Sequence, residues 1–327
     1  MKVRSLCENF TGGGVRRILG LAGDDLEDVT EIRIRIHKPL IIKRRSYEYF
    51  IKTDGSLEQG QAGSQMPSAY CPDREDIQKT MELMSNYSLY AFEDEIRNGY
   101  ITLPGGHRVG LCGQAVVEGG CVKTIRHLNG FTIRITHEIK GCGAGVIGHI
   151  ALPSLRHTMV ISPPGCGKTT LLRDIIRILS MGDRKLGISG RTVGVADERS
   201  EIAGCYQSVP QNDVGIRTDV MDGAPKAQSM RMLLRSMSPE IIAADEIGRI
   251  EDVAAIDEMI HSGVKLLCTA HGASVDELRG KDVLAQLLAK DIIERFIVLK
   301  GGGRPGVIEG IYDNLGRRIN NGGVESP

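Results

Sequence analysis

The sequence predicts an α/β fold whose C-terminal part is built on a parallel β-sheet. Three largely apolar runs lie within residues 157–161, 239–248 and 264–272, and none has a wholly polar face. Strands that are buried on both faces of a parallel sheet show this continuous apolar pattern. Each run ends in, or leads into, residues that can bind a ligand or take part in catalysis. Parallel sheets of this kind bind ligands at the carboxyl ends of their strands. A chain of 327 residues also has room for a second core.

The first run leads into a glycine-rich loop and then a helical pattern, which is the order of a phosphate-binding loop. Gly165 and Gly167 let main-chain N–H groups point at a polyphosphate, and the following helix N-terminus adds partial positive charge. Lys168 is predicted to bind the β- and γ-phosphates of ATP. Ser162 replaces the usual first glycine, and because serine is small we expect the loop to close. The predicted ATP-binding residues are Pro163, Pro164, Gly165, Cys166, Gly167, Lys168, Thr169 and Thr170.

Two carboxylates follow the second run. Asp245 is predicted to hold Mg²⁺ together with the hydroxyl of Thr169, and Glu246 to polarise the attacking water as general base. Two acids after an apolar run can also cap a helix, but the upstream phosphate-binding loop favours catalysis. The third run ends in His271, which can sense the γ-phosphate by hydrogen bonding; the alternative is an ordinary strand end.

A further strand is predicted between the phosphate-binding loop and the two carboxylates. Residues 191–201 contain a short segment rich in β-branched side chains, bounded by polar residues. An extra strand in this place distinguishes ATPases with a catalytic glutamate from simple nucleotide kinases.

Arginines add a second set of candidates. Arg231 and Arg235 are four residues apart on a predicted helix that leads into the strand before Asp245, so they share one helix face. Phosphoryl transfer is catalysed mainly by positioning and by neutralising negative charge. An arginine pair in this place suits a finger that reaches the nucleotide of a neighbouring subunit, and a ring would follow. Arg217 and Arg249 lie in the same module, and each arginine can equally be a solvated side chain.

Six motifs carry a resemblance: the phosphate-binding loop and residues 197–199, 217–220, 234–239, 245–248 and 269–272. Together they resemble the secretion-ATPase superfamily of type II and type IV systems, and within it the stage III sporulation protein AA family of endospore-forming bacteria. The resemblance covers the whole chain, most strongly residues 130–315. It implies a RecA-like P-loop NTPase core behind a smaller mixed α/β N-terminal domain. It also implies that Glu198 and Arg199 belong to the acidic box, Arg217 to the arginine box and His271 to the histidine box.

The resemblance implies a Mg²⁺-dependent ATPase that assembles as a homohexameric ring. Subunit closure on ATP hydrolysis would drive assembly or transport in a membrane-embedded channel between mother cell and forespore. Two alternatives remain open: a DNA-translocating or recombination ATPase with the same core, and a nucleotide-dependent scaffold with little turnover.

The composition bears on the partners of the protein. Lys plus Arg and Asp plus Glu are 41 each, and a net charge of zero argues against a strong nonspecific grip on nucleic acid. No apolar run approaches the roughly 20 residues of a membrane span, and no leader pattern begins the sequence. We therefore expect a cytoplasmic protein that associates with the membrane through partners. The eight cysteines include no Cys-x-x-Cys pair, so we expect them to be small packing residues and not disulfides or zinc ligands. Cys166 is the exception, because a thiol in the phosphate-binding loop could make the protein sensitive to oxidation.

Local patterns predict the domain organisation. Residues 31–36 alternate between charged and apolar side chains, which predicts a strand with one solvent-exposed face. Residues 74–86 are predicted to form a helix that begins after Asp73. Residues 53–70 are predicted to be a flexible hairpin insertion, and residues 301–306 a hairpin turn between the last two strands. The predicted divisions are an N-terminal domain of residues 1–138, a linker of residues 139–150 and an ATPase domain of residues 151–327.

Overall fold

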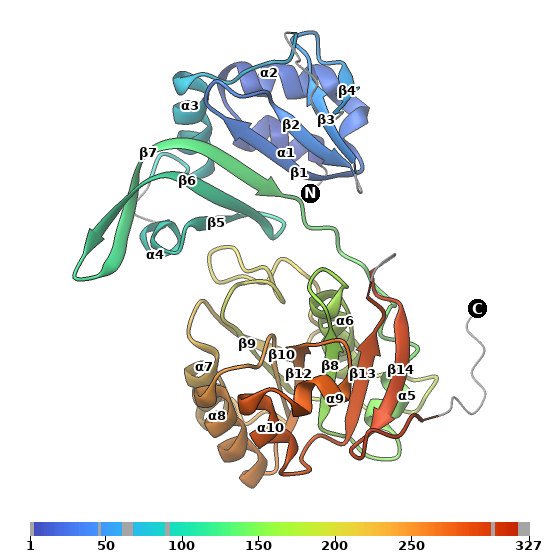
Figure 1. Cartoon of the computed structure of the whole chain (residues 1–327). Coiled ribbons are helices and arrows are strands. Elements are labelled where there is room, and N and C mark those ends of the chain that lie inside the picture. The colour runs from blue at the N-terminus through green and yellow to red at the C-terminus, as the bar shows by residue number, and fades with distance from the viewer. Residues whose placement is uncertain (1–2, 45–46, 61–67, 89–91, 302–304, 320–327) are drawn as a thin grey trace. The chain divides into compact units, whose positions relative to one another are not determined.

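The structure of the chain is a computed structural model, which divides into two compact units, Met1–His137 and Glu138–Pro327 (Figure 1). Each unit contains its own seven-stranded sheet and is described by itself. In the described part of the chain, no helix combines the length and hydrophobicity that crossing a bilayer requires. The described residues are 3–44, 47–60, 68–88, 92–301 and 305–319.

The first unit is an antiparallel sheet with helices, a mixed α/β arrangement. The strand order is β4-β3-β2-β1-β7-β6-β5 (Figure 1). The strands are β1 (Val29–Arg35), β2 (Ile41–Arg44), β3 (Tyr47–Ile51), β4 (Leu57–Gln59), β5 (Tyr100–Leu103), β6 (His107–Glu118) and β7 (Cys121–Arg134). The helices are α1 (Val3–Phe10), α2 (Gly13–Ala22), η1 (Gly23–Leu26), α3 (Arg74–Met84) and α4 (Glu93–Arg97).

Two local predictions in this unit are confirmed. β1 buries Ile32 and Ile34 while the intervening residues are only partly buried. α3 begins after Asp73, whose carboxylate accepts the Asp76 N–H at 2.9 Å in a capping box. The helices α1 and α2 and the long β6–β7 hairpin were not predicted from the sequence. The outer part of that hairpin is largely exposed and has no alternating pattern to reveal it.

The described residues of the predicted flexible insertion at residues 53–70 are ordered. Its described part contains β4, which pairs with β3, and a bridge joins Lys52 to Ala69. Residues 61–67 of this prediction lie outside the described residues. A hairpin is present, as predicted, but its second strand belongs to the sheet. Main-chain pairing with β3 supplies the order, and it needs no apolar pattern.

The second unit confirms the predicted α/β core. Its strand order is β10-β9-β11-β12-β8-β13-β14, with β13 and β14 antiparallel and the other neighbouring pairs parallel. The strands are β8 (Thr158–Ser162), β9 (Val193–Asp197), β10 (Thr218–Asp222), β11 (Ile241–Ala244), β12 (Lys265–His271), β13 (Arg295–Leu299) and β14 (Ile308–Asp313). The helices are α5 (Ile147–Ala151), α6 (Lys168–Met181), α7 (Lys226–Ser236), α8 (Ile250–His261), α9 (Val275–Arg279) and α10 (Asp282–Leu288).

Helices cover both faces of this sheet. Within β8, Val160 packs in one core with residues of α5 and α6, whereas Met159 and Ile161 pack in a second core with residues of α7, α8, α9 and α10. Successive side chains of a strand point to opposite faces, so a central strand buried on both sides is largely apolar along its whole length. The largely apolar runs of the sequence therefore mark the central strands.

The strand order decides which loops meet. β12 lies between β8 and β11, with His271 opposite Ser162 and Cys268 opposite Ala244. The three strands are parallel, so their carboxyl ends share one edge of the sheet. The loop after β8, the end of β12 and the loop after β11 consequently come together at this edge.

The predicted linker at residues 139–150 is wrong in its second half. Val146, Ile147 and Ile150 are fully buried and pack with α6 in the core of the second unit. The Gly143 N–H donates to the buried carboxylate of Asp174 at 2.7 Å. The glycines before this segment suggested a mobile connection, but the apolar residues after them form one face of α5 that must be covered.

We expect Ile150→Ala to lower the free energy of unfolding by about 2–5 kcal/mol, because it leaves a cavity in the core. The matched control is Ile139→Ala in the same predicted linker, where the side chain is 56% exposed and the loss should stay within about 0.5 kcal/mol. Urea unfolding followed by circular dichroism measures both. A loss for Ile150→Ala as small as that of the control would show that the segment contributes nothing to the core.

Candidate active site

The loop between β8 and α6 has the main-chain shape of a phosphate-binding loop. Gly165 and Gly167 have φ angles of 74° and 90°, in the left-handed region that other residues rarely adopt. Gly167 is the N-cap of α6, so the positive end of the helix dipole faces the loop. Residues 163–167 form the loop, and residues 168–170 form the first turn of the helix.

Two neighbours of the loop explain how it closes. Ser162 is buried at the end of β8, and its hydroxyl donates to the Pro163 carbonyl oxygen at 2.8 Å, so serine is accommodated where glycine is usual. The Gly306 N–H, from the β13–β14 connection, donates to the Cys166 carbonyl oxygen at 2.8 Å. The predicted final hairpin is therefore present and supports the loop, although its residues 302–304 lie outside the described part.

A hydrogen-bonded chain connects the loop lysine to the predicted base. Lys168 is 6% exposed, and its Nζ lies 3.0 Å from His271 Nδ1. An ammonium group only donates, so Nδ1 accepts and the ring proton sits on Nε2, which donates to Glu246 Oε1 at 2.8 Å. Burial lowers the pKa of Lys168, although the charges of Asp245 and Glu246 oppose this effect. A cation in a site that disfavours its charge is suited to bind an anion.

Thr169 and Asp245, the predicted magnesium ligands, are hydrogen-bonded to each other. The Thr169 hydroxyl donates to Asp245 Oδ2 at 2.6 Å across 76 residues of sequence, and the Thr269 hydroxyl donates to Oδ1. Hydroxyl and carboxylate oxygens suit Mg²⁺, which commonly takes one or two protein ligands and completes its shell with water and phosphate oxygens. The two residues fit this ion. Among the described residues, no three or more His, Cys, Asp or Glu side chains are grouped so that they could hold a metal ion.

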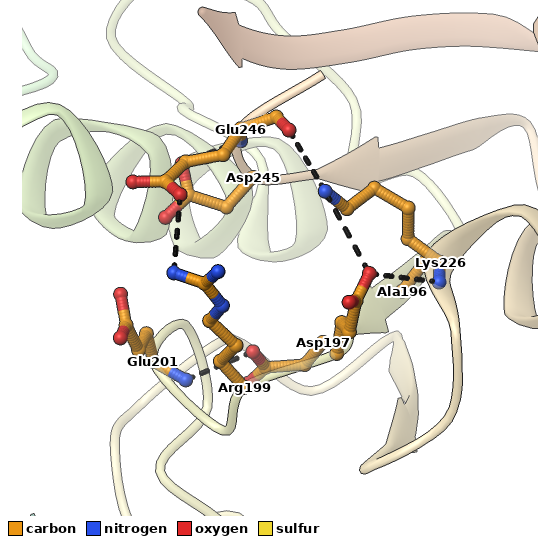
Figure 2. A pocket seen from close by; sticks show the side chains of 8 residues that line it. Ala196, Asp197, Arg199, Glu201, Lys226, Asp245 and Glu246 are labelled. Carbon is orange, nitrogen blue, oxygen red and sulfur yellow. Dashed lines mark hydrogen bonds and ion pairs between the residues drawn. The ribbon is translucent and has the colours of Figure 1, made fainter. Parts of the chain in front are cut away.

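Glu246 is held in an unusual conformation. Its φ angle is 53°, which is uncommon for a residue with a side chain. Its carboxylate accepts from His271 and from Arg199 Nη1, the latter at 3.4 Å (Figure 2). Burial acts to raise the pKa of Glu246, but the His271 hydrogen bond and the nearby positive charges outweigh it and lower the pKa. The carboxylate is ionised at neutral pH, as a general base must be.

The turn after β9 is held from two sides by buried side chains. The Asp197 carboxylate accepts the N–H groups of residues 201–203 at 2.9, 3.1 and 2.8 Å. The Arg173 guanidinium donates to the carbonyl oxygens of residues 201 and 202 at 2.7 and 2.5 Å. Burial raises the pKa of Asp197 to about 6, against the opposing effect of its N–H donors. Arg173 was not predicted from the sequence as a site residue; its position one helical turn after Thr169 is the signal that could have identified it.

Glu198 pairs with cations beside the predicted base. Its Oε1 lies 3.5 Å from Arg249 Nη1, and its Oε2 lies 3.7 Å from Lys226 Nζ. Lys226, which was not predicted from the sequence as a site residue, also donates to the Glu246 carbonyl oxygen at 2.8 Å. Figure 2 shows the pocket, whose lining includes Asp197, Lys226 and Glu246, with Lys226 extended towards the Glu246 main chain.

The remaining predicted arginines lie outside this cluster. Arg231 on α7 makes an ion pair at 2.9 Å with Glu258 of α8, and Arg235 is exposed on the same helix. Arg217 precedes β10 at the amino ends of the strands, where its guanidinium donates to the Ser180 carbonyl oxygen at 2.8 Å. Ser180 lies at the opposite end of α6 from Lys168. The structure therefore does not bring Arg217 to the phosphate-binding loop of its own subunit.

Comparison with solved structures identifies the fold. The chain is similar to the ADP-bound pilus retraction motor PilT, with a TM-score of 0.55 and 14% identity over 95% of this chain and 82% of PilT. For the ATPase DotB of Yersinia pseudotuberculosis the TM-score is 0.57 at 12% identity, over 94% and 81% of the two chains. The fold is thus that of the P-loop secretion ATPases, with a RecA-like core.

Sequence comparison then identifies the family. The family model for "Sporulation stage III, protein AA" matches residues 2–319. Stage III sporulation protein AA of Bacillus subtilis (strain 168) is 38% identical over 289 residues, which cover 88% of each protein. This chain belongs to the sporulation stage III protein AA family. Protein SEEDLING PLASTID DEVELOPMENT 1 of Arabidopsis thaliana is 34% identical over 122 residues, which cover 37% of this chain and 17% of that protein.

Proposed function

We propose that this protein is a Mg²⁺-dependent ATPase that acts as the motor of a secretion-type channel complex in sporulation. The observation that carries the proposal is the hydrogen bond between Thr169 and Asp245 beside the chain of Lys168, His271 and Glu246. Magnesium ligands, a phosphate-binding cation and a general base are the parts that hydrolysis of a nucleoside triphosphate requires. Membership of a sporulation family supports the biological setting.

In the proposed reaction each residue has one task. The loop N–H groups and Lys168 hold the β- and γ-phosphates, and Thr169 and Asp245 hold the metal. The bound ion would neutralise charge that develops on the phosphoryl oxygens. Glu246 orients a water molecule and takes its proton. His271 holds the Glu246 carboxylate by a hydrogen bond, and it loses its contact with Lys168 when the lysine turns to the phosphate.

We further propose that the subunits form a ring, a homohexamer by resemblance to secretion ATPases, that docks on a membrane-embedded channel between mother cell and forespore. The placement of the arginines supports action across subunits. Arg235 is exposed on α7, while Arg217 lies far from the phosphate-binding loop of its own chain. Arginines placed in this way suit a site completed by a neighbouring subunit, as arginine fingers do.

The direct test is phosphate release from Mg²⁺ and ATP by the purified chain, with and without membranes from sporulating cells. The proposal expects turnover that membranes increase. Stimulation by DNA with a steep salt dependence would instead identify a DNA-translocating ATPase. ATP binding without turnover under every condition would identify a nucleotide-dependent scaffold.

We expect Arg235→Ala to be inactive alone and to regain activity when mixed with Glu246→Gln subunits. In a mixed ring an intact Glu246 can face an intact Arg235 from its neighbour, so some sites are complete. Phosphate release across a range of mixing ratios measures the effect, and Arg184→Ala, a change at another exposed arginine, is the control. An unchanged rate for Arg235→Ala alone would remove this arginine from the mechanism.

A further inference from the structure

Lys226 stands in an unusual place for a lysine. It is the first residue of α7, where the positive end of the helix dipole disfavours a cation, and it is 8% exposed. A buried ammonium group needs partners for its charge and its three donors. Such a costly placement within the lining of the candidate active site is a reason to ask what the side chain does there.

Three elements supply the partners of this ammonium group. Its Nζ lies 2.8 Å from the Glu246 carbonyl oxygen after β11 (Figure 2). It also lies 3.7 Å from Glu198 Oε2 after β9 and 3.9 Å from Asp252 Oδ2 on α8. The partners are themselves fixed. Glu198 accepts the Lys226 main-chain N–H at 3.2 Å, and Asp252 accepts the Arg249 N–H at 3.0 Å at the start of α8. The lysine therefore has little freedom to move.

The contact with Glu246 is to its main chain. The Glu246 N–H donates to the Thr269 hydroxyl at 2.9 Å, and its carbonyl oxygen accepts from Lys226. These two bonds hold the residue from both sides at its positive φ angle of 53°. A residue with a side chain keeps such a conformation only when its surroundings impose it. The direction of the Glu246 carboxylate thus depends on the Lys226 ammonium group.

We infer that Lys226 is a positioning residue: its ammonium group fixes the Glu246 main chain so that the carboxylate faces the attacking water. The inference rests on the proposed ATPase function. Lys226 acts through Glu246 and leaves the phosphates to Lys168. Its position at the start of α7 also connects the base to the helix that carries Arg231 and Arg235. Displacement of α7 by a neighbouring subunit would therefore alter the base directly.

The test compares Lys226→Met, Lys226→Arg and the control Lys265→Met in the full chain. Lys265 is another partly buried lysine, paired with Glu294 at 2.9 Å at the amino end of β12, away from the site. We expect Lys226→Met to lower kcat about 10- to 100-fold, the usual effect of losing one charge-assisted hydrogen bond. The Kd for a fluorescent ATP analogue should change less than about twofold. Lys226→Arg, which can still donate, should recover most of kcat, and Lys265→Met should retain it.

The outcomes separate this inference from the proposed function. If the wild-type chain hydrolyses no ATP under any condition, the proposed function fails. If the wild type is active and Lys226→Met has the same kcat, the positioning role is wrong while the ATPase stands. A loss of nucleotide affinity in step with kcat would also overturn it, because Lys226 would then be a general support of the pocket. If Lys226→Met does not fold, Lys226→Gln, a neutral donor of similar length, is judged by the same criteria.

Discussion

Glu246→Gln is expected to bind ATP and to lose turnover by about 10²- to 10⁴-fold, the contribution usual for a general base. Glutamine keeps the size of the side chain and can still accept from His271 Nε2, which lies 2.8 Å from the present carboxylate. It cannot take a proton from water. The nucleotide is held by other groups, so the Kd for ATP should stay within about threefold. Single-turnover hydrolysis and equilibrium binding measure the two effects.

The control for this variant is Glu309→Gln on β14, where the side chain is exposed and the change should leave kcat unaltered. Hydrolysis by Glu246→Gln at the wild-type rate would show that another group polarises the water. Weak binding together with weak turnover would show that Glu246 supports the pocket and is not the base.

Lys168→Ala is expected to weaken ATP binding by at least about 100-fold, since it removes the cation that would make charge-assisted hydrogen bonds to two phosphates. Fluorescent-nucleotide binding measures this loss, and Lys185→Ala, an exposed lysine beyond the end of α6, is the control. Comparable ATP affinities for the wild type and Lys168→Ala would refute the assignment of the loop.

The same variant should not lose thermal stability. Burial lowers the pKa of Lys168, which means that the folded chain disfavours the charged form relative to the unfolded chain. Removing the charge therefore relieves an unfavourable interaction at neutral pH. A midpoint of thermal unfolding equal to or above that of the wild type is expected. A large decrease would mean that the bond to His271 at 3.0 Å stabilises the fold more than burial of the charge disfavours it.

Much of the core could be predicted because local patterns and the sheet agree. The strands β8, β11 and β12 are almost wholly buried between the two helix layers, so their sequences are largely apolar. The left-handed φ angles at positions 165 and 167 favour glycine, so the loop can be recognised from these two residues in the sequence. The β6–β7 hairpin and the burial of α5 escaped prediction, because an exposed hairpin has no apolar period and a single short helix has too few turns to show one.

The amino-acid sequence by itself determined the fold class, the glycine-rich loop before α6, and the position of Asp245 and Glu246 after one strand. Each of these is marked by a local pattern of residues that are close in the chain. Only the tertiary structure decided that Lys226 holds the Glu246 main chain, that Arg173 grips the turn after β9, and that Arg217 lies at the far edge of the sheet. These contacts join segments that are distant in sequence. Strand order and helix packing create them, and no local spacing encodes either.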